Sequence, residues 1–571
     1  MLLSGAEIVI EELVGHGIEI IFGYPGANVI NIYDELYKNS HRLTHILSAH
    51  EQGAAHAADA YARVSGKIGV VIATSGPGAT NLVTGIANAY LDSVPVVFIT
   101  GNVPVETLGR DSFQEIDIMG VTLPIVKHSY VVKDVKSLRR TLKEAFLIAG
   151  TGRKGPVLVD IPKCVQIDTC DYDPELMMTL SPGSVWKTDL SGLDAAMALI
   201  EKSKRPYIYC GGGVNASNTQ SGVMELSGKI LAPVGASVMG IGAAAHSYEL
   251  YLGLSGMHGR YASSIAKSEA DLILALGVRF SDRATGNTQE YAKDSVVIHA
   301  DIDAAEFGKN IGPDVSLCGD LNDILPILID RSCAVSDREW LNRIRELKAL
   351  DNTPPVEDFT PRGIIARVNA FYDADTVVTT DVGQHQMWVA QYYKFEKPRK
   401  FITSGGLGAM GFGLGAAIGA CIARGRKRTV LFTGDGSFGM NLTELATAVT
   451  YDLPVTIALL NNNALGLVRQ LQTFFFDKRY SQSTLDRRTD FPAVAQAFGA
   501  KGFSASNLTE LDSVLEKIND ISGPCLIDCK IDIDDKVLPM IPTGGTVRDI
   551  INPISAKLEL LTEEMRIKNV K

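Results

Sequence analysis

A chain of 571 residues is too long for a single hydrophobic core, so about three domains are expected. Of the residues, 46% are hydrophobic and 21% are charged, a composition typical of a globular protein and not of a disordered one. The net charge is −11 and no stripe of Lys and Arg runs along one face, which argues against a nucleic acid partner. Gly, Pro and Asp92 interrupt the apolar text over 68–100, so no membrane span and no membrane partner are expected.

The eight cysteines are scattered, without the paired spacing of a metal site. Cys525 and Cys529 fall on one face of an apolar strand, where a free thiol behaves as a small hydrophobic side chain. Reduced thiols favour a cytoplasmic location. At the other end of the chain, the text Ser4-Gly5-Ala6-Glu7 predicts a capped helix start, so the fold is expected to begin close to Met1 without a targeting segment.

The first block of the chain alternates helices with strands. Helices are predicted over 4–15 and over Glu51–Ser65. The predicted strands are Ile18–Phe22, Leu43–Ser48, Ile68–Ala73 and Val94–Thr100. The last two are continuous apolar runs, typical of parallel strands that are buried on both faces. The alternation predicts a doubly wound sheet over 1–168.

Two more α/β blocks are predicted, over 188–332 and 358–548, followed by a C-terminal tail over 549–571. Polar, proline-bearing text around 169–187 and at 351–355 predicts the linkers. The strands expected in the two blocks are Tyr207–Cys210, Leu272–Leu276, Val296–Ala300, Thr376–Thr379, Thr429–Phe432, Val455–Leu460 and Cys525–Asp528. The predicted fold class is therefore α/β, with three doubly wound parallel-sheet domains.

The strongest chemical signal lies in the third block. A strand is followed by the turn Gly434-Asp435-Gly436-Ser437, then by a helix over Asn441–Tyr451, and the next strand ends in Asn461-Asn462. Asp435 and Asn462 are thus expected at the carboxyl ends of parallel strands, where open α/β sheets bind ligands. A hard cation such as Mg²⁺ prefers oxygen ligands, which we assign to Asp435, Asn462 and the carbonyl of Ala464.

Glycines beside this carboxylate would let backbone amides approach a diphosphate, whose oxygens would complete the metal shell. The alternative is that Gly434-Asp435-Gly436 is only a turn and the asparagines only a loop. The spacing between the two motifs, and the strand–helix–strand text between them, favour cofactor binding.

These residues resemble the thiamine diphosphate enzymes, whose pattern is GDG followed at about this spacing by NN. The resemblance extends along the whole chain and is most specific for the acetolactate synthase (acetohydroxyacid synthase) catalytic subunits. It implies a pyrimidine-binding first domain, a central FAD-binding-like domain and a diphosphate-binding third domain, with thiamine diphosphate, Mg²⁺ and FAD as cofactors.

The resemblance also implies a carboligase, which forms the first common product of branched-chain amino acid biosynthesis. Such an enzyme decarboxylates pyruvate and joins the two-carbon unit to a second pyruvate, giving 2-acetolactate. With 2-oxobutanoate as the acceptor, it gives 2-aceto-2-hydroxybutanoate. A dry pocket is needed, because protons would otherwise divert the reaction to acetaldehyde.

Glu51, in the text His50-Glu51-Gln52-Gly53, opens a helix directly after a strand. On the sequence alone it is a helix-start glutamate favoured by the helix dipole. The resemblance implies a catalytic role, in which its carboxyl hydrogen-bonds the pyrimidine N1′ and promotes removal of the thiazolium C2 proton. In this family the glutamate and the diphosphate site lie on different subunits, which implies a homodimer or a dimer of dimers. Family members also bind a small regulatory subunit.

Further site residues follow from the resemblance. Gly26, Phe113, Gln114 and Lys163 would line the reaction centre or its channel; without the resemblance, Phe113 would be a core residue. The chain departs from the family at Cys164, where Asp is usual. The implied cofactor contacts are Val382, Gly383, Gln384, His385, Gly408, Met410, Gly434, Gly436 and Ser437.

The implied FAD contacts are Arg153, Gly212, Gly213, Met257, His258, Arg279, Arg283, Asp301 and Asp320. The triplet Gly211-Gly212-Gly213 lacks the G-x-G-x-x-G pattern, so FAD follows from the resemblance and not from spacing. The segment 279–283 is similar to the FAD-containing synthases, and Arg283 would bind a 2-oxo acid carboxylate. From spacing alone, Arg283 would be a surface salt-bridge residue. The flavin is expected to be structural, because the net reaction needs no redox step.

Three questions stay open at this point. A pyruvate oxidase-type flavoenzyme shares the three-block plan, although Arg283 and the segment 537–542 favour the synthase. A non-catalytic homologue is the other alternative, against which the joint presence of Glu51, Asp435 and Asn462 argues. The preferred acceptor is also open, because Leu471 stands where the family usually has a tryptophan associated with 2-oxobutanoate.

Overall fold

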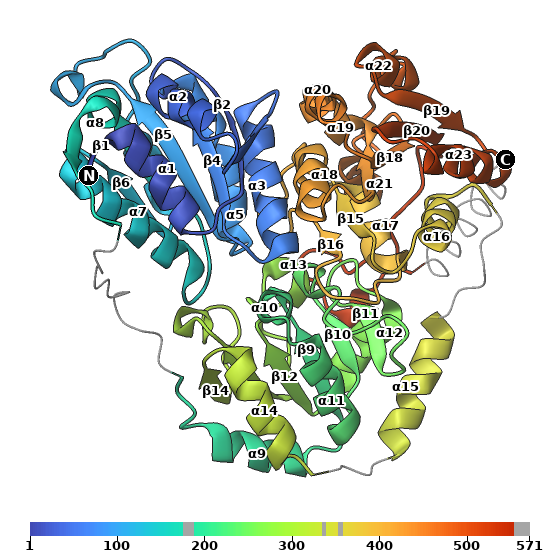
Figure 1. Cartoon of the computed structure of the whole chain (residues 1–571). Helices are drawn as coiled ribbons and strands as arrows, with labels where there is room; N and C mark the ends of the chain where they lie inside the picture. Colours follow the sequence, from blue (N-terminus) through green and yellow to red (C-terminus); the bar gives the residue numbers. More distant parts are fainter. Residues whose placement is uncertain (175–187, 334–337, 352–357, 553–571) are drawn as a thin grey trace.

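A computed structural model describes residues 1–174, 188–333, 338–351 and 358–552 (Figure 1). It contains three α/β domains, each built on a six-stranded parallel sheet, as predicted. Most of the predicted linkers and the tail beyond residue 552 lie outside the described residues. No helix in the described part of the chain is both long and apolar enough to cross a bilayer. The residue limits of the predicted domains stay predictions.

The first domain has the strand order β3-β2-β4-β5-β7-β6. Its strands are β2 (Ile20–Tyr24), β3 (Thr44–Leu47), β4 (Gly69–Ala73), β5 (Val96–Asn102), β6 (His128–Val131) and β7 (Val157–Pro162). Its helices are α1 (Gly5–Gly15), α2 (Ile30–Lys38), α3 (Glu51–Ser65), α4 (Pro77–Asn81), α5 (Val83–Leu91), α6 (Ile118–Thr122), α7 (Val135–Gly150) and α8 (Lys163–Ile167). The four predicted strands and both predicted helices are confirmed to within about two residues, the usual uncertainty of element ends.

One prediction in this region is wrong. Residues assigned to the start of a linker form β8 (Thr169–Asp171), which pairs antiparallel with β1 (Leu2–Ser4). The short strand escaped prediction because its side chains are polar and its stability comes from main-chain pairing with the other end of the domain. The predicted capping box is confirmed, since Ser4 and Glu7 cap the start of α1 in both directions.

The third domain has the order β16-β15-β17-β18-β20-β19. Its strands are β15 (Val377–Thr380), β16 (Phe401–Ile402), β17 (Thr429–Gly434), β18 (Val455–Asn461), β19 (Lys501–Ala505) and β20 (Cys525–Lys530). Its helices are α16 (Pro361–Phe371), α17 (Gln384–Tyr392), α18 (Phe412–Ala423), α19 (Asp435–Asn441), α20 (Leu445–Thr450), α21 (Gly466–Phe475), α22 (Phe491–Ala497) and α23 (Leu508–Asn519). By position in each domain, the first and third sheets therefore have the same strand order.

Helices α3 and α18 occupy equivalent places in these two domains, each between the second and third strands, and they pack against each other (Figure 1). The contact is close because α18 is rich in small residues. A Cβ atom on Gly419 would lie 1.9 Å from the carbonyl oxygen of Ala57, and one on Gly415 would lie 2.8 Å from that of Gly53. The small side chains thus allow the backbones of the two helices to approach, and the apolar core continues from one domain into the other.

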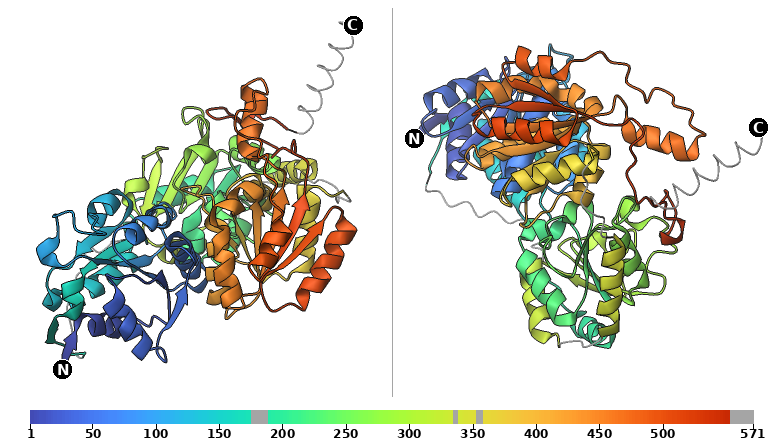
Figure 2. Two further views of the ribbon diagram at one scale, coloured as in Figure 1. Left: turned by 90° about the horizontal axis from the view of Figure 1, so that it is seen from above. Right: turned by 90° about the vertical axis from the view of Figure 1, so that its right-hand side faces the viewer.

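The middle domain lies beneath the other two in Figure 1 and in the right-hand view of Figure 2. Its strands are β9 (Pro206–Cys210), β10 (Val234–Ala236), β11 (Tyr251–Leu254), β12 (Leu272–Leu276), β13 (Val296–Asp301) and β14 (Val315–Cys318). Its helices are α9 (Leu193–Lys202), α10 (Gly212–Ser217), α11 (Gln220–Ile230), α12 (Tyr261–Glu269), α13 (Asp282–Thr285), α14 (Leu321–Arg331) and α15 (Arg338–Asp351). The order β11-β10-β9-β12-β13-β14 is that of dinucleotide-binding sheets, which bind ligands where the order reverses, here between β9 and β12.

Candidate functional site

A cavity of about 130 Å³ lies at the carboxyl ends of β17 and β18. Strand β17 ends at Gly434 directly before Asp435, and β18 ends at Asn461 directly before Asn462. All the predicted diphosphate and metal residues except Gly408 line it: Val382, Gly383, Gln384, His385, Met410, Gly434, Asp435, Gly436, Ser437, Asn462 and Ala464. The structure therefore brings together residues from four separate segments of the third domain.

The local structure after β17 differs from the prediction. Residues 434–437 are not a free turn, because Asp435 is the first residue of α19, and the predicted helix from Asn441 is divided by a 3-10 turn at 442–444. The helix start was not predicted because glycine, present at 434 and 436, has a low helix propensity. The Asp435 carboxylate therefore lies in the first turn of a helix, where the helix dipole favours negative charge.

Asp435 has the features of a metal ligand. Its side chain is buried, and Oδ1 makes no hydrogen bond to any described residue. Burial is the main cause that raises the pKa of Asp435, to about 6. A buried carboxylate with an unpaired oxygen is unfavourable by itself, which is the situation that a bound cation relieves.

Asn462 is held in one orientation by its neighbours. Its Nδ2 donates to Gln384 Oε1 (3.1 Å), while its Oδ1 accepts from the backbone N–H of Ala464 (3.1 Å). Gln384 is fixed in turn, because its Nε2 donates to the carbonyl of Asp535 (2.7 Å). Ala464 forms an isolated bridge with Thr484 in which the neighbouring residues make the hydrogen bonds, so its own carbonyl points away from that segment.

The possible metal ligands in this cavity carry little negative charge. Nowhere in the described part of the chain do three or more His, Cys, Asp or Glu side chains gather in a group suited to a metal ion. Asp435 is thus a single carboxylate beside an amide and a carbonyl, and a bound cation would need further oxygens from its ligand. A diphosphate brings those oxygens and the missing negative charge, so the residues present fit a Mg²⁺–diphosphate group.

Close packing around the cavity explains its glycines. A Cβ atom on Gly436 would lie 2.9 Å from Leu465, and one on Gly434 would lie 3.0 Å from the ring of His385. Burial lowers the pKa of His385 to about 3, so its imidazole is neutral and can offer one N–H to an anion. Ser437 Oγ donates to the carbonyl of Val382 (2.7 Å), which joins α19 to the loop before α17.

The segment that carries Gly408 and Met410 is held by buried acids. Asp92 of the first domain accepts from the N–H groups of Gly405 (3.1 Å) and Gly406 (2.7 Å). Asp381 accepts from the N–H of Gly411 (2.7 Å) on the other side. Met410 reaches the cavity, whereas Gly408, with a φ of +71°, does not line it.

Glu51 begins α3 in the first domain and is buried. Its Oε2 accepts from Asn81 Nδ2 (2.9 Å), and a Cβ atom on Gly78 would lie only 3.1 Å from its Oε1. The residues just before it are held by Glu444 of the third domain, which accepts from the N–H groups of Ala49 (3.3 Å) and His50 (2.9 Å). The start of α3 is thus capped from another domain of the same chain.

The other predicted catalytic residues lie in the first domain as well. Phe113 is 87% exposed, which contradicts the core position expected from its apolar character alone. Gln114 has a φ of +61° and packs its backbone against Gly76, while Lys163 begins α8. Neither Gly26 nor any of the four other predicted catalytic residues lines the diphosphate cavity of the same chain. The two groups of residues are therefore not brought together by one chain.

A larger cavity, of about 330 Å³, lies at the switch point between β9 and β12. It is lined by the predicted residues Arg153, Gly212, Gly213, Arg279, Arg283, Asp301 and Asp320. Met257 and His258 do not line it, but the N–H of Met257 donates to the carbonyl of Arg283 (2.8 Å) at its edge. The lining also includes Lys154 and Glu306, which the sequence did not single out because no motif connects such distant segments.

All three domains contribute to this larger cavity, since Arg153 comes from the first and Gly405 from the third. Arg153 is already paired, with Asp303 (3.0 Å) and Glu306, and its Nε donates to Ser93. Burial raises the pKa of Asp301 to about 6. The cavity therefore has charged groups of both signs in its lining, of which Arg153 and Glu306 pair with each other.

The three-domain architecture is that of the thiamine diphosphate enzymes, as comparison with known families shows. The chain matches the N-terminal TPP binding domain of thiamine pyrophosphate enzymes over residues 3–121, their central domain over 193–328 and their C-terminal TPP binding domain over 381–529. The chain thus belongs to the thiamine pyrophosphate enzymes.

Individual relatives narrow this class. The chain is 43% identical to a probable acetolactate synthase large subunit of Methanocaldococcus jannaschii, over 97% of this chain and 96% of the relative. It is 42% identical to the acetolactate synthase large subunit of Lactococcus lactis, over 95% of each. It is 41% identical to the large subunit of acetolactate synthase isozyme 2 of Escherichia coli, over 97% of this chain and the whole relative. Within the class, the chain belongs to the acetolactate synthase large-subunit family.

Proposed function

We propose that this chain decarboxylates pyruvate and transfers the two-carbon unit to a second pyruvate or to 2-oxobutanoate. The products would be 2-acetolactate and 2-aceto-2-hydroxybutanoate, the first common intermediates of branched-chain amino acid biosynthesis. The observation that carries the proposal is the cavity at the ends of β17 and β18, with the unpaired Oδ1 of Asp435 beside the fixed amide of Asn462. Family membership supports the choice of reaction.

Asp435, Asn462 and the carbonyl of Ala464 would hold Mg²⁺, and the loop from Val382 to His385 would hold the diphosphate. When bound, thiamine diphosphate supplies the electron sink that a 2-oxo acid needs to lose carbon dioxide. The chain's own work is then to bind and orient the cofactor, to keep water out and to move protons.

Glu51 would hold and return a proton at the pyrimidine N1′ of the cofactor. The observed setting suits this role, because the side chain is buried and one of its oxygens is fixed by Asn81. Its position at the first turn of α3 is kept by the contact of Glu444 with the residues before it. Gly408 and Met410 would orient the pyrimidine end, on a segment anchored by Asp92 and Asp381.

A second copy of the chain would bring Glu51 to the diphosphate cavity. The proposal rests on the separation of the two groups within one chain and on large apolar side chains left exposed near them. Phe113 is 87% exposed, and Phe475 and Phe476 beyond the cavity are 46% and 54% exposed. Such aromatic surfaces are typical of interfaces, so a homodimer or a dimer of dimers is the proposed active unit.

The larger cavity would bind FAD. It lies at the switch point of a sheet with the dinucleotide-binding order, and the backbone of Gly211–Gly213 lies beside it. Arg283 at its rim has a 64% exposed side chain and would bind the carboxylate of a 2-oxo acid. Since the net reaction transfers no electrons to an acceptor, the flavin would support the fold and not the chemistry.

Two further proposals concern a partner subunit and the location of the protein. The relatives are called large subunits, which supports a small regulatory subunit as a partner of this chain. All eight cysteines are free, which supports a reducing, cytoplasmic location.

The decisive experiment incubates the purified chain with Mg²⁺, thiamine diphosphate, FAD, pyruvate and 2-oxobutanoate, and quantifies both products and carbon dioxide. We expect both products to form and to require Mg²⁺ and thiamine diphosphate. Carbon dioxide release without either product, or pyruvate-dependent bleaching of the flavin at the rate of turnover, would contradict the proposal. Product formation at the same rate without added FAD, in protein shown to be free of flavin, would contradict the FAD assignment alone.

A further inference from the structure

Lys267, on α12, is a buried cation outside both cavities. Its side chain is almost fully covered, with a residue exposure of 8%. No carboxylate among the described residues pairs with it; instead, its Nζ lies 4.6 Å from the ring centre of Tyr291 and 5.3 Å from that of Tyr209. The rings replace a counter-ion, because the face of an aromatic ring attracts a cation.

Among the described residues, the ammonium group of Lys267 makes one hydrogen bond, to the segment that carries Arg283. Lys267 Nζ donates to the carbonyl of Ala284 (3.2 Å), in the one-turn helix α13 (Asp282–Thr285) that carries Arg283. The carbonyls at the end of so short a helix need partners from elsewhere. The N–H of Met257 satisfies the carbonyl of Arg283 (2.8 Å), and Lys267 satisfies the next one.

This short helix is therefore fixed from two sides. Gly256 is so close that a Cβ atom on it would lie 2.8 Å from the carbonyl of Arg283. From α12, Lys267 Nζ holds the carbonyl of Ala284, which lines the larger cavity. The guanidinium of Arg283 has only long contacts: Nη1 lies 3.4 Å from Thr543 Oγ1 and 3.8 Å from Met257 Sδ, and Nε lies 3.7 Å from Asp282 Oδ2. Its direction therefore depends strongly on the backbone of α13.

We propose that Lys267 is a positioning residue, whose ammonium group, held between the rings of Tyr209 and Tyr291, fixes the Ala284 carbonyl and so aims Arg283 at the carboxylate of the 2-oxo acid. This inference rests on the proposed function, in which Arg283 binds that carboxylate. It assigns a role in substrate binding to a residue that touches neither substrate nor cofactor.

The carboxylates closest in sequence to these segments have partners of their own. Glu269 on α12 pairs with Arg343 of α15 (2.7 Å), and Asp282 lies 3.7 Å from Arg283 within α13. Further groups on packed elements are Tyr207, which bonds Ser263, Tyr251 on β11, and Arg548 and Asp549 of the 3-10 turn 547–549. Helix α15 also carries Arg338, Glu339, Arg345, Glu346, Lys348 and Asp351, the last paired with Arg260 (3.0 Å). Desolvation by burial lowers the pKa of Lys267 to about 7.

This setting predicts a pH dependence of substrate binding. The ammonium form is attracted by the rings and donates strongly to the carbonyl, and it is lost as the pH rises through about 7. The KM for pyruvate should therefore rise with pH between about 6 and 8.5, whereas kcat should respond much less. In Lys267→Met, which keeps the length of the side chain without the charge, the KM should be high and should lose this rise.

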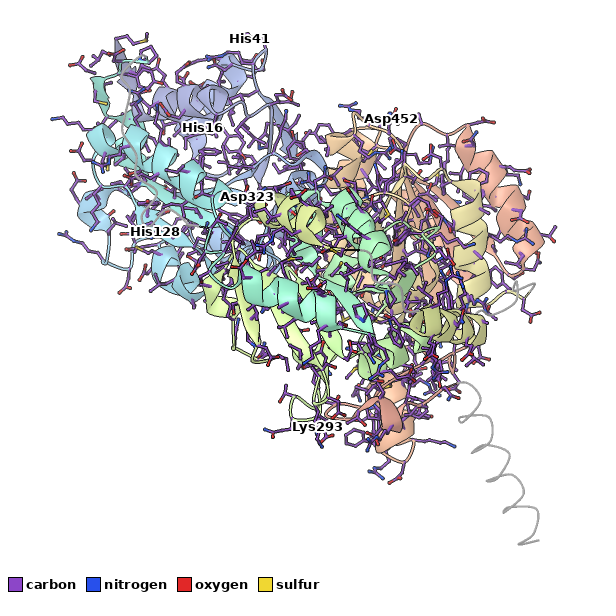
Figure 3. All side chains as sticks on the ribbon, turned by 90° about the horizontal axis from the view of Figure 1, so that it is seen from below. His16, His41, His128, Lys293, Asp323 and Asp452 are labelled. Atoms are coloured by element: carbon purple, nitrogen blue, oxygen red, sulfur yellow. The ribbon has the colours of Figure 1, made fainter. Side chains whose placement is uncertain are left out.

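The test compares wild type, Lys267→Met, Tyr291→Leu and the matched control Tyr291→Phe, each as the full chain with its cofactors. Tyr291 lies in the loop before β13; Lys293, two residues further on, is labelled at the outer edge of the middle domain in Figure 3. Steady-state kinetics are measured from pH 6 to 8.5, and thermal unfolding midpoints are measured alongside.

For Lys267→Met we expect a KM for pyruvate about 5- to 10-fold higher at pH 6.5, a kcat within about twofold, and an unfolding midpoint that does not fall. Tyr291→Leu should shift the pH at which KM rises by about half a unit to the acid side, and Tyr291→Phe should not, since it keeps the ring.

An unchanged KM and an unchanged pH profile in a folded Lys267→Met chain would overturn the inference. Loss of kcat and of the unfolding midpoint together, without a change in KM, would also overturn it, since that result indicates a purely structural lysine. If the wild-type chain formed no acetolactate at all, the proposed function would fail and this inference with it. These results are therefore distinguishable.

Discussion

The first and third domains have the same strand order and pack through equivalent helices, yet only the third closes a cavity around its predicted residues. In the third domain, Asp435 and Asn462 are buried, and the amide of Asn462 is oriented by hydrogen bonds within that domain. In the first domain, Glu51 is buried, but Phe113 is open to solvent.

The difference teaches that one architecture supplies two halves of a site. In the proposed function, the third domain would anchor the diphosphate, and the first would supply Glu51, which a second copy of the chain would bring to that cavity. Substitutions in the third domain should therefore lower the affinity for the cofactor, whereas substitutions in the first domain should lower kcat.

The largest expected effect belongs to the first domain. Glu51→Gln should lower kcat by at least about 100-fold, because an amide cannot carry the proton. The unfolding midpoint should change little, since glutamine still accepts from Asn81. Glu19→Gln, at an exposed position of the same domain, is the matched control and should leave kcat unchanged. Near-normal acetolactate formation by Glu51→Gln would disprove the catalytic assignment.

Asp435→Asn tests the other half of the comparison. The Mg²⁺ concentration for half-maximal activity should rise at least about 10-fold, because the single carboxylate ligand is lost. In the wild type this concentration should also rise as the pH falls through about 6, where Asp435 becomes protonated. Asp512→Asn, on α23 outside the cavity, is the control and should leave the Mg²⁺ requirement unchanged.

Asp435→Asn should also stabilise the metal-free protein. The folded chain raises the pKa of Asp435 from 3.8 to about 6, so folding binds a proton, and stability falls as the pH rises from about 4 through about 6. Asparagine removes this pH-dependent contribution to the free energy of unfolding, which amounts to about 3 kcal/mol at pH 8 and to much less at pH 4. Urea unfolding of both proteins at the two pH values measures it, and an equal or lower stability of Asp435→Asn at pH 8 would contradict the argument.

Glu444→Gln probes the contact between the two domains. Glutamine keeps one acceptor but turns an NH₂ group toward the N–H groups of Ala49 and His50, so stability should fall by about 1–3 kcal/mol. The start of α3 would shift, and kcat should fall about 10-fold without a change in Mg²⁺ affinity. Glu516→Gln, exposed on α23, is the control. A loss of stability with full activity would show that the contact does not position Glu51.

The smallest effect is expected at Leu471, which is 39% exposed on α21. Leu471→Trp should raise the ratio of 2-aceto-2-hydroxybutanoate to 2-acetolactate about fivefold at equal substrate concentrations, because an aromatic face favours the larger acceptor. Stability should change by less than about 0.5 kcal/mol at this partly exposed position. Leu350→Trp, on the exposed face of α15, is a control, and an unchanged product ratio in Leu471→Trp would exclude residue 471 as a determinant of acceptor choice.

The sequence by itself determined the parts that depend on local order. Buried strands such as Leu272–Leu276 are continuous apolar runs, and Asp435 and Asn462 follow two such runs directly, so their place at one sheet edge could be predicted. The capped start of α1 could also be predicted, because the cap involves only Ser4 and Glu7. The order of the strands could not be predicted, because pairing such as β9 with β12 depends on contacts between distant segments.

Only the tertiary structure decided which distant residues serve one site. Glu444 is about 400 residues from the helix start that it caps, and Arg153 and Gly405 meet at a cavity of the middle domain. Lys267 looks like an ordinary helix lysine in the sequence, and its burial between two rings follows from the packing of α12 on the sheet. Local patterns fix elements because they act over a few residues, whereas a shared site depends on burial and charge that exist only after the domains have packed.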